Sequence, residues 1–228
     1  MAETLTPTIE DYLGLIYLLQ REGEVVIAAR LAEGLNVSRP TVAATLQRME
    51  RDGLVALDEQ KAIGLTSAGL VAAQDVLRRH MLAEWLLHRV IGLPWHQVHE
   101  EADRLEHAFS PAAVARLDAL LEQPEACPHG NPMPGATPVP AVPLDEVAEG
   151  QEVVITRIVE AAEQHPELLA FLEENGLLPG ARLRVTSCRP CNETVTVEVG
   201  KAAGKGKTGR PVVLGLATAR LIRVRSES

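Results

Sequence analysis

The sequence predicts a mostly α-helical protein that begins with a winged helix-turn-helix and ends in a small all-β domain. Three observations carry this prediction. Apolar residues recur at helical spacing over most of the first 121 residues, a Pro-rich stretch follows, and short strand-like runs fill much of the remainder. A length of 228 residues agrees with two or three domains.

The composition is that of an ordinary globular protein. Hydrophobic residues make up 46% of the chain, which is enough for ordinary cores. No apolar run approaches the ~18 residues of a membrane span, and the first residues lack the pattern of a signal peptide. Three cysteines, an odd number, suit a reducing compartment better than a disulfide framework. We therefore expect a cytoplasmic protein with no membrane partner.

The net charge of −9 bears on the possible partners. It argues against general binding of polyanions, although it leaves room for a local basic face. Carboxylates repel one another where they gather, and a bound divalent cation would relieve that repulsion.

The first helix is expected to open at Thr8 and to end before Gly23. Thr8 and Asp11 stand three residues apart, which matches a variant of the capping box at a helix start. Asp11 therefore has a structural interpretation as a capping residue beside any role in binding.

Two short helices joined by a turn are predicted next. The first covers residues 27–34, and the second begins after Ser38, a good N-cap, with Pro40 in its first turn. The second helix presents hydroxyl and cationic side chains away from its apolar stripe: Arg39, Thr41, Thr45, Arg48 and Arg51. This layout is typical of a helix-turn-helix that reads the DNA major groove. The alternative is an ordinary helical hairpin with a solvated face.

A two-stranded wing is predicted from residues 54–57 and 63–66, with Lys61 near its tip in reach of a phosphate. Thr66 is expected to cap a long helix that runs to about Val90. His80 and Glu84 lie four residues apart on this helix and are therefore neighbours on one face.

A further helix is predicted after the break at Gly92-Leu93-Pro94. At about 100° per residue, His99, Asp103, Glu106 and His107 fall within roughly a third of its circumference. Neutral imidazole and carboxylate together form a ligand set for a divalent first-row metal ion. A solvated charged face is the alternative interpretation of this stripe.

The last part of the chain is predicted to be β-rich. A helix over residues 110–121 leads into a Pro-rich linker with extended character. Beyond it, residues 151–160, 181–188, 193–200 and 211–225 are predicted strands around a short helix near residues 166–175, which together suggest a small barrel.

Two weak motifs in this region are set aside. Residues 201–209 end like a phosphate-binding loop, but Lys201 stands where that motif requires its first glycine. Cys188 and Cys191 form half of a zinc site at best, so we interpret them as ordinary thiols.

Several segments together resemble the diphtheria toxin repressor family of metal-activated transcriptional regulators. These are VSRPTVAATLQRMERDGLV (37–55), LTSAG (65–69), RRHMLAEWLL (78–87), IGLPWHQVHEEADRLEH (91–107) and PHGNPMPG (128–135). The resemblance implies a winged helix-turn-helix domain (1–72), a helical dimerisation and metal-binding domain (73–126), a linker (127–148) and an SH3-like, FeoA-like domain (149–228). It implies a homodimer that binds double-stranded operator DNA and takes no small-molecule substrate.

The resemblance also implies two metal sites per subunit. The primary site of the family corresponds here to Asp11, Asp103, Glu106 and His107, and the ancillary site to His80, Glu84 and His99. Side chains of the C-terminal domain complete the ancillary site, and the candidates are Glu163, Gln164, His165 and Glu167.

Departures from the family pattern indicate the metal. Iron-sensing members carry sulfur donors where this chain has Asp11 and Asp103, and hard oxygen donors suit Mn²⁺ better than Fe²⁺. Manganese sensors often have another acid where this chain has Gly14. The expected cofactor is therefore Mn²⁺, with Fe²⁺ as the alternative.

The resemblance and the helix pattern together predict the DNA-contacting residues: Ser38, Arg39, Pro40, Thr41, Thr45, Arg48, Arg51 and Lys61. The expected function is a repressor of metal-transport genes rather than an enzyme. A metal-dependent hydrolase is the alternative of another class, but the chain has no HExxH motif and no second catalytic cluster.

Overall fold

The computed structural model describes residues 5–200, 209 and 211–226. The chain forms two compact units. The first comprises the chain up to His80 together with Glu106–Phe109, and the second comprises Met81–Leu105 and the chain from Ser110 onward. Within the described residues, none of the helices is long and apolar enough to cross a membrane.

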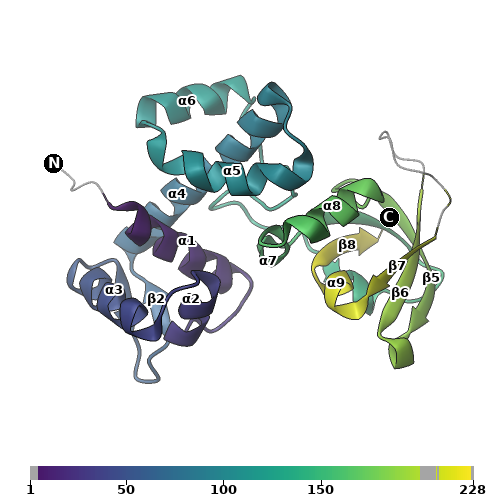
Figure 1. Cartoon of the computed structure of the whole chain (residues 1–228), viewed down its shortest axis with the longest axis horizontal. Coiled ribbons are helices and arrows are strands. Elements are labelled where there is room, and N and C mark those ends of the chain that lie inside the picture. The colour runs from purple at the N-terminus through teal and green to yellow at the C-terminus, as the bar shows by residue number, and fades with distance from the viewer. Residues whose placement is uncertain (1–4, 201–208, 210, 227–228) are drawn as a thin grey trace. The chain divides into compact units, whose positions relative to one another are not determined.

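The first unit is built from three helices and a two-stranded wing (Figure 1). These elements are α1 (Pro7–Arg21), α2 (Ala28–Gly34), α3 (Arg39–Arg51), β1 (Val55–Leu57) and β2 (Ile63–Leu65), followed by the start of α4 (Ser67–Trp85). Apolar side chains such as Leu13, Ile16 and Leu31 are fully buried and pack in one core. The predicted helix-turn-helix and wing are thus confirmed.

The start of α1 differs from the prediction. The helix begins at Pro7 with Thr6 as its N-cap residue, and Thr6 makes no side-chain capping bond. Proline suits the first turn because its missing N–H would have no partner there. Thr8 therefore lies inside the helix, and the predicted capping role of Thr8 and Asp11 is wrong.

The starts of α3 and α4 agree with the sequence analysis. The Ser38 hydroxyl accepts a hydrogen bond from the Thr41 N–H at 3.3 Å, and the Thr66 hydroxyl accepts one from the Gly69 N–H at 3.1 Å. A Cβ at Gly69 would lie 1.9 Å from the Leu54 carbonyl oxygen. Only glycine therefore lets α4 begin so close to the wing.

The long helix predicted to run to about Val90 is present, but its last turns are π-helical. The α-helix α4 ends at Trp85, and the π-helical segment η1 (Leu86–Ile91) follows and closes on Gly92 in the left-handed conformation. The short turn η2 (Trp95–Gln97) leads into α5 (Val98–Leu105). Glu106–Ala108 forms the 3-10 turn η3, so the helical spacing predicted for Glu106 and His107 does not hold.

The Pro-rich stretch is only partly the extended linker that its composition predicts. After α6 (Pro111–Leu120), the chain from Cys127 to Met133 is buried and is folded into a turn, with a bridge between Ala126 and Pro132. Cys127 and Met133 pack against Leu82 in a small core. This segment therefore belongs to the interior of the second unit.

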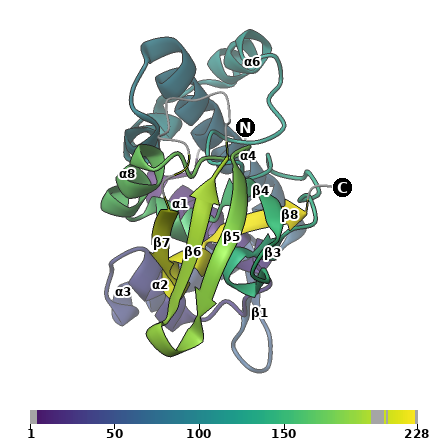
Figure 2. The same cartoon turned by 90° about the vertical axis from the view of Figure 1, so that its right-hand side faces the viewer.

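The C-terminal part of the second unit is a six-stranded antiparallel sheet in the order β3-β8-β4-β5-β6-β7 (Figure 2). The strands are β3 (Val142–Pro143), β4 (Glu152–Ile158), β5 (Arg182–Arg189), β6 (Thr194–Val199), β7 (Pro211–Gly215) and β8 (Ile222–Ser226). Among the described residues β3 and β7 are unpaired edges of this sheet, so the predicted closed barrel is not confirmed.

Short helices and turns complete this domain. They are η4 (Leu144–Glu146), α7 (Glu160–Glu163), α8 (Pro166–Glu174), η5 (Pro190–Asn192) and α9 (Leu216–Arg220). The helix α9 interrupts the single strand predicted for residues 211–225. The phosphate-loop-like stretch 201–209 lies outside the described residues except for Gly209, and all three cysteines are free thiols.

Candidate metal centres and DNA-reading surface

The first unit brings three predicted ligands together, and we call them the α1–η3 cluster: Asp11, Glu106 and His107. Their donor atoms all lie within 4.8 Å of one another. His107 Nε2 is 3.2 Å from Asp11 Oδ1 and 3.5 Å from Glu106 Oε1. Two carboxylates and one imidazole nitrogen suit a hard divalent cation.

Three further side chains surround the α1–η3 cluster. His107 Nδ1 lies 2.6 Å from Glu10 Oε2, and the other oxygen of Glu10 pairs with Arg79 at 2.6 Å. His80 Nδ1 donates to Glu106 Oε2 at 2.7 Å. Sequence reasoning did not identify Glu10 or Arg79, because each has the ordinary appearance of a charged residue on an amphipathic helix.

The second unit contains a buried cluster of potential ligands, comprising Glu84, His99, Cys127, His129 and Glu163. Glu84, Cys127 and His129 have donor atoms within 4.8 Å of one another. Glu163 Oε2 lies 2.9 Å from His99 Nδ1 and 3.6 Å from His129 Nδ1. Glu84 Oε1 lies 3.2 Å from His129 Nδ1 and 3.4 Å from His99 Nδ1.

Burial governs the electrostatics of the buried cluster. Glu84 and His129 are fully buried, and Glu163 is 3% exposed. Burial by itself would lower the pKa of His129, but Glu163 and Glu84 outweigh it and the pKa is raised. Burial, reinforced by Glu84, Glu163 and Glu160, raises the pKa of the Cys127 thiol well above its usual value.

The buried cluster fits a divalent cation. Two buried carboxylates are costly unless positive charge lies beside them. His129 Nδ1 is buried and has no hydrogen-bond partner among the described residues, although it faces both carboxylates. When the ring is neutral, the Nδ1 lone pair is available to a metal ion beside the two carboxylates.

The hydrogen bond of the second ring nitrogen, Nε2, fixes the orientation of the His129 ring. His129 Nε2 donates to the Trp95 carbonyl oxygen at 3.3 Å, so Nδ1 carries the lone pair when the ring is neutral. Trp95 in turn donates from its indole to the Pro128 carbonyl oxygen at 2.9 Å. The two rings pack with their centroids 4.5 Å apart.

Glu163 is held by Asn131, which lies in the same turn as His129. The Asn131 amide donates to Glu163 Oε1 and to the Ile158 carbonyl oxygen, each at 2.7 Å. Arg157 donates to Asn131 Oδ1 at 3.0 Å. The turn sits tightly on β4, because a Cβ at Gly130 would lie 2.3 Å from the Thr156 carbonyl oxygen.

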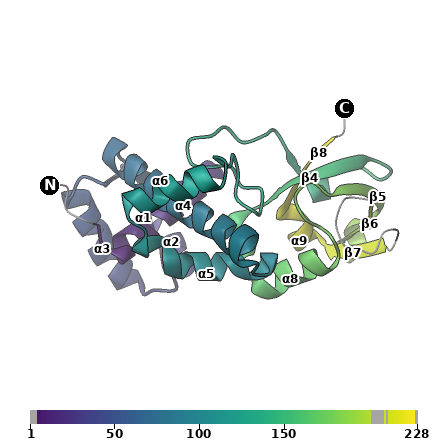
Figure 3. The same ribbon diagram turned by 90° about the horizontal axis from the view of Figure 1, so that it is seen from above.

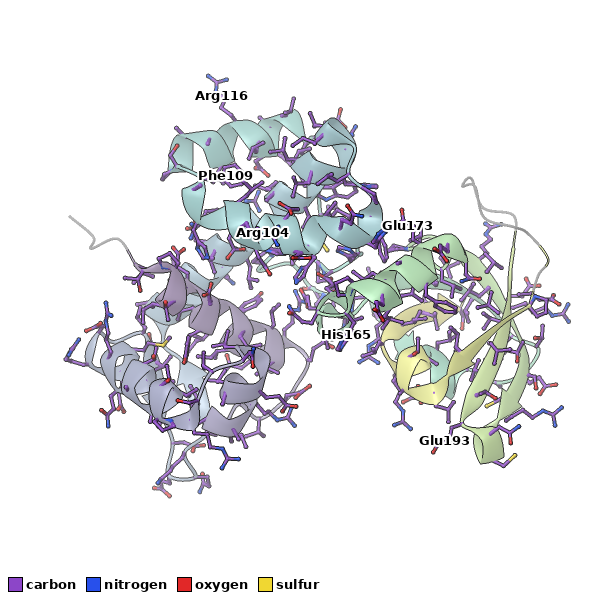
Figure 4. The ribbon with its side chains drawn as sticks, in the orientation of Figure 1. Arg104, Phe109, Arg116, His165, Glu173 and Glu193 are labelled. Carbon is purple, nitrogen blue, oxygen red and sulfur yellow. The ribbon has the colours of Figure 1, made fainter. Side chains whose placement is uncertain are left out.

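The helix α8, labelled in Figure 3, packs against η2 within the second unit. Glu173 accepts hydrogen bonds from the backbone N–H groups of Trp95 and His96 at 3.3 and 3.2 Å. His96 Nδ1 also lies 2.6 Å from Glu173 Oε2. Figure 4 labels Glu173 near the end of α8 and His165 just before its start.

The remaining predicted ligands lie as follows. Asp103 is an exposed residue of α5 in the second unit, where its Oδ2 is 4.0 Å from His99 Nε2. Of the C-terminal candidates, Glu163 is buried, while Gln164, His165 and Glu167 are exposed. The Gln164 amide lies 3.0 Å from His99 Nε2. The predicted ligand roles of His80 and Asp103 stay predictions.

Cys127 and His129 were not identified as ligands from the sequence. The available signal was a Cys-x-His pair, CPH, at the start of the segment that carries the family resemblance. Its position among prolines predicted a linker, and an exposed linker has no fixed partners for a thiol and an imidazole.

Most of the predicted DNA-contacting side chains are exposed on α3, at its N-cap or in the wing. Residues Ser38 to Thr41, Arg48 and Arg51 are exposed, and Thr45 is half-buried. Arg48 and Arg51 both lie near Asp52, with nitrogen–oxygen distances of 3.9 and 3.1 Å. Lys61 lies exposed in the turn of the wing with a φ of 62°.

Comparison with known proteins extends this description. The iron dependent repressor N-terminal DNA binding domain matches residues 4–63, and the metal binding and dimerisation domain of the same repressors matches residues 66–135. The chain belongs to the diphtheria toxin repressor family. A FeoA domain matches residues 142–226. The protein is therefore a metal-dependent transcriptional repressor of that family.

Similar proteins of known name include an iron-dependent repressor and a diphtheria toxin repressor. The iron-dependent repressor IdeR of Mycobacterium leprae is 38% identical over 206 residues, which is 85% of this chain and 90% of that protein. The diphtheria toxin repressor of Corynebacterium diphtheriae is 40% identical over 75% of this chain and 74% of its own length.

Similar solved structures include a manganese-dependent transcriptional repressor in complex with manganese. It has a TM-score of 0.85 and 34% identity, and the match covers 96% of this chain and all of that one. The manganese regulator SloR has a TM-score of 0.75 and 29% identity over 98% of this chain.

Proposed function

We propose that this protein is a Mn²⁺-activated repressor that binds operator DNA as a homodimer and controls metal-transport genes. One observation carries the proposal. Asp11 of the DNA-reading domain lies within 4.8 Å of donor atoms of Glu106 and His107, which the chain supplies from the segment between α5 and α6. Asp11 falls in the matched DNA binding domain, and Glu106 and His107 fall in the matched metal binding and dimerisation domain. A ligand set drawn from two domains suits a switch better than a rigid catalytic site.

The two clusters are proposed to hold two metal ions per subunit. The α1–η3 cluster, with Asp103 as an additional ligand, is proposed as the regulatory site. The buried cluster is proposed as the second site, in which Glu84 and His99 act with Glu163, and Cys127 and His129 extend the predicted set. A bound divalent cation would neutralise the clustered carboxylates and hold their oxygen atoms together.

The proposed mechanism concerns the freedom of α1. Without neutralisation, Asp11 and Glu106 repel each other, and the segment Glu106–Phe109 is less firmly held to α1. The segment Glu106–Phe109 is continuous with α5 of the dimerisation domain. Fixing this segment to α1 therefore restrains the DNA-reading domain relative to the dimerisation domain. In a dimer, this restraint sets the separation of two α3 helices, which must be about 34 Å to enter successive major grooves.

Metal binding is proposed to shift the protein from conformations that cannot bind DNA to the conformation that can. If the metal-free protein is competent to bind DNA only ~1% of the time, removing that handicap raises DNA affinity about 100-fold. By reciprocity, operator DNA tightens metal binding by the same factor. Arg39, Thr41 and Thr45 are proposed to reach bases, and Arg48, Arg51 and Lys61 to contact phosphates.

The choice of Mn²⁺ rests on donor chemistry. Asp11 and Asp103 supply hard oxygen donors, which suit Mn²⁺ better than Fe²⁺. The manganese complex among the similar structures supports this choice, whereas the names of the curated relatives support Fe²⁺, the alternative.

Fluorescence anisotropy with DNA from metal-transporter promoters tests the proposal. Metal-free protein would be titrated with Mn²⁺, anaerobic Fe²⁺ and Zn²⁺ in parallel, with Asp103→Cys as a companion variant. We expect Mn²⁺ to switch on binding at the lowest free concentration, and Asp103→Cys to shift the response towards Fe²⁺. An equal response to Mn²⁺ and Fe²⁺ would contradict the metal assignment, and binding indifferent to every metal would contradict the switch.

A further inference from the structure

The two ring nitrogens of His107 face different groups. Nε2 faces Asp11 and Glu106 of the α1–η3 cluster, at 3.2 and 3.5 Å. Nδ1 faces Glu10 Oε2 at 2.6 Å. All three carboxylates can only accept hydrogen bonds when ionised, but Glu10 is the nearest to the ring and makes the short contact with Nδ1. In the neutral ring the proton therefore lies on Nδ1, and the lone pair is on Nε2.

Glu10 is itself fixed by a second contact. Its other oxygen, Oε1, pairs with an Arg79 guanidinium nitrogen at 2.6 Å, and both side chains are about nine-tenths buried. The same guanidinium donates to the Glu106 main-chain oxygen at 3.1 Å. Arg79 therefore connects α1 with η3, and both oxygens of Glu10 already have partners.

We propose that Glu10 is a positioning residue that selects the metal-binding tautomer of His107, and that Arg79 holds Glu10 in place. The inference rests on the proposed function of the α1–η3 cluster and adds to it a pair of residues that do not touch the metal ion. An imidazole that ligates a metal commonly donates its other N–H to a carboxylate, which fixes the ring and raises its basicity.

The arrangement has a consequence for the metal-free protein. A histidine held with Nε2 towards Asp11 and Glu106 has lost its rotational freedom before an ion arrives, so less entropy is lost on binding. Free imidazole side chains would instead be divided between two tautomers and several rotamers. Losing such a partner typically lowers metal affinity about 10- to 100-fold.

The test compares three variants in the full-length protein. Glu10→Ala removes the acceptor, Glu10→Gln keeps an oxygen acceptor but loses the charge opposite Arg79, and Asp75→Asn is the control. Asp75 Oδ2 also pairs with Arg79, at 3.3 Å from Nε, but the Asp75 side chain is 67% exposed and does not reach His107. Thermal unfolding of each metal-free variant shows whether it is folded.

Two readouts are independent of DNA binding. Nitrogen-15 NMR of the metal-free protein, with His107 assigned by comparison with His107→Ala, reports which ring nitrogen carries the proton. We expect Nδ1–H in the parent protein and in Asp75→Asn, and a shift towards Nε2–H in Glu10→Ala. Electron paramagnetic resonance of free Mn²⁺ measures affinity, for which we expect a loss of about 10- to 100-fold in Glu10→Ala and a smaller loss in Glu10→Gln.

Three outcomes would overturn the inference. The parent protein could carry the proton on Nε2, Glu10→Ala could bind Mn²⁺ as tightly as the parent, or it could lose affinity while keeping the Nδ1–H tautomer. The first outcome is measured on the parent protein alone and so does not depend on whether any variant folds. None of them contradicts the proposed function, which fails only if the parent protein does not bind Mn²⁺ at this cluster or does not couple it to DNA binding.

Discussion

The α1–η3 cluster and the buried cluster differ in exposure, in donor atoms and in the way the chain builds them. In the first, the side chains of Asp11 and His107 are 46% and 21% exposed, and the donors are oxygen and nitrogen. In the second, the side chains of Glu84 and His129 are fully buried, and a thiol lies among the donors.

This difference separates two roles. An ion at a half-exposed site exchanges with solvent without unfolding the chain, whereas a fully buried site opens only through a local unfolding event. We therefore expect the α1–η3 cluster to sense metal concentration and the buried cluster to stabilise the second unit.

The largest effect is expected from His107→Ala. Removing this imidazole takes away one ligand of the α1–η3 cluster, so the metal-dependent gain in DNA affinity, about 100-fold, should be lost. DNA-binding anisotropy with and without Mn²⁺ measures it. Arg104→Ala serves as the control, because Arg104 pairs with Glu100 and Glu101 on the exposed side of α5. A His107→Ala protein that still responds fully to Mn²⁺ would assign the switch to the buried cluster.

The second effect is expected from His129→Ala, measured as thermal stabilisation. At a metal concentration 100 times Kd, binding adds about 2.7 kcal/mol, which raises the Tm of a chain of this size by about 5–11 °C. His129→Ala should lose most of that increase. Because Glu163 and Glu84 raise the pKa of His129, bound protons compete with the metal, and the stabilisation should shrink as pH falls through that raised value.

In the metal-free protein, the contribution of His129 to stability changes with pH in the opposite direction. A histidine with a raised pKa stabilises the fold below its unfolded-state pKa, and that contribution is lost as pH rises through the raised value. Equal metal stabilisation of the parent protein and His129→Ala would show that the buried cluster does not bind metal.

A third effect concerns metal preference. Cys127→Ser replaces a soft donor of the buried cluster with a hard one, so Co²⁺ affinity should fall by on the order of tenfold while Mn²⁺ affinity changes little. The sulfur-to-cobalt absorption band and competition titrations measure both. Cys188→Ser is the matched control, because Cys188 is a free thiol outside the cluster. An unchanged absorption band in Cys127→Ser would remove the thiol from the ligand set.

The smallest effect is expected at the contact between α8 and η2. Hydrogen bonds from His96 and the Trp95 N–H outweigh burial and lower the pKa of Glu173. A carboxylate with a lowered pKa stabilises the fold above its unfolded-state pKa and loses that contribution as pH falls through the lowered value. Glu173→Gln should therefore lower the Tm by at most about 2 °C at neutral pH, and the difference should vanish as pH falls through the lowered pKa of Glu173. A Tm difference between the parent protein and Glu173→Gln that does not change with pH would show that the charge of Glu173 is not its cause.

The sequence by itself determined the features that depend on near neighbours. Ser38 and Thr66 cap helices as predicted, because an N-cap bond joins residues three apart. The apolar stripe of α3 is buried as predicted, since helical spacing alone places those side chains on one face. The open sheet and the helix α9 between β7 and β8 were not anticipated, because strand-like residues can also fill a short buried helix.

The family resemblance grouped Asp11 with Glu106 and His107, but only the tertiary structure decided which further side chains meet them. Proline-rich composition predicted an exposed linker, yet packing against β4 buries Cys127 and His129 beside Glu163, which lies more than thirty residues further along the chain. In the same way, α5 ends at Leu105, and the turn that follows carries His107 to Glu10 and Asp11 of the first helix. Such contacts depend on how whole elements pack, and no local pattern of residues encodes them.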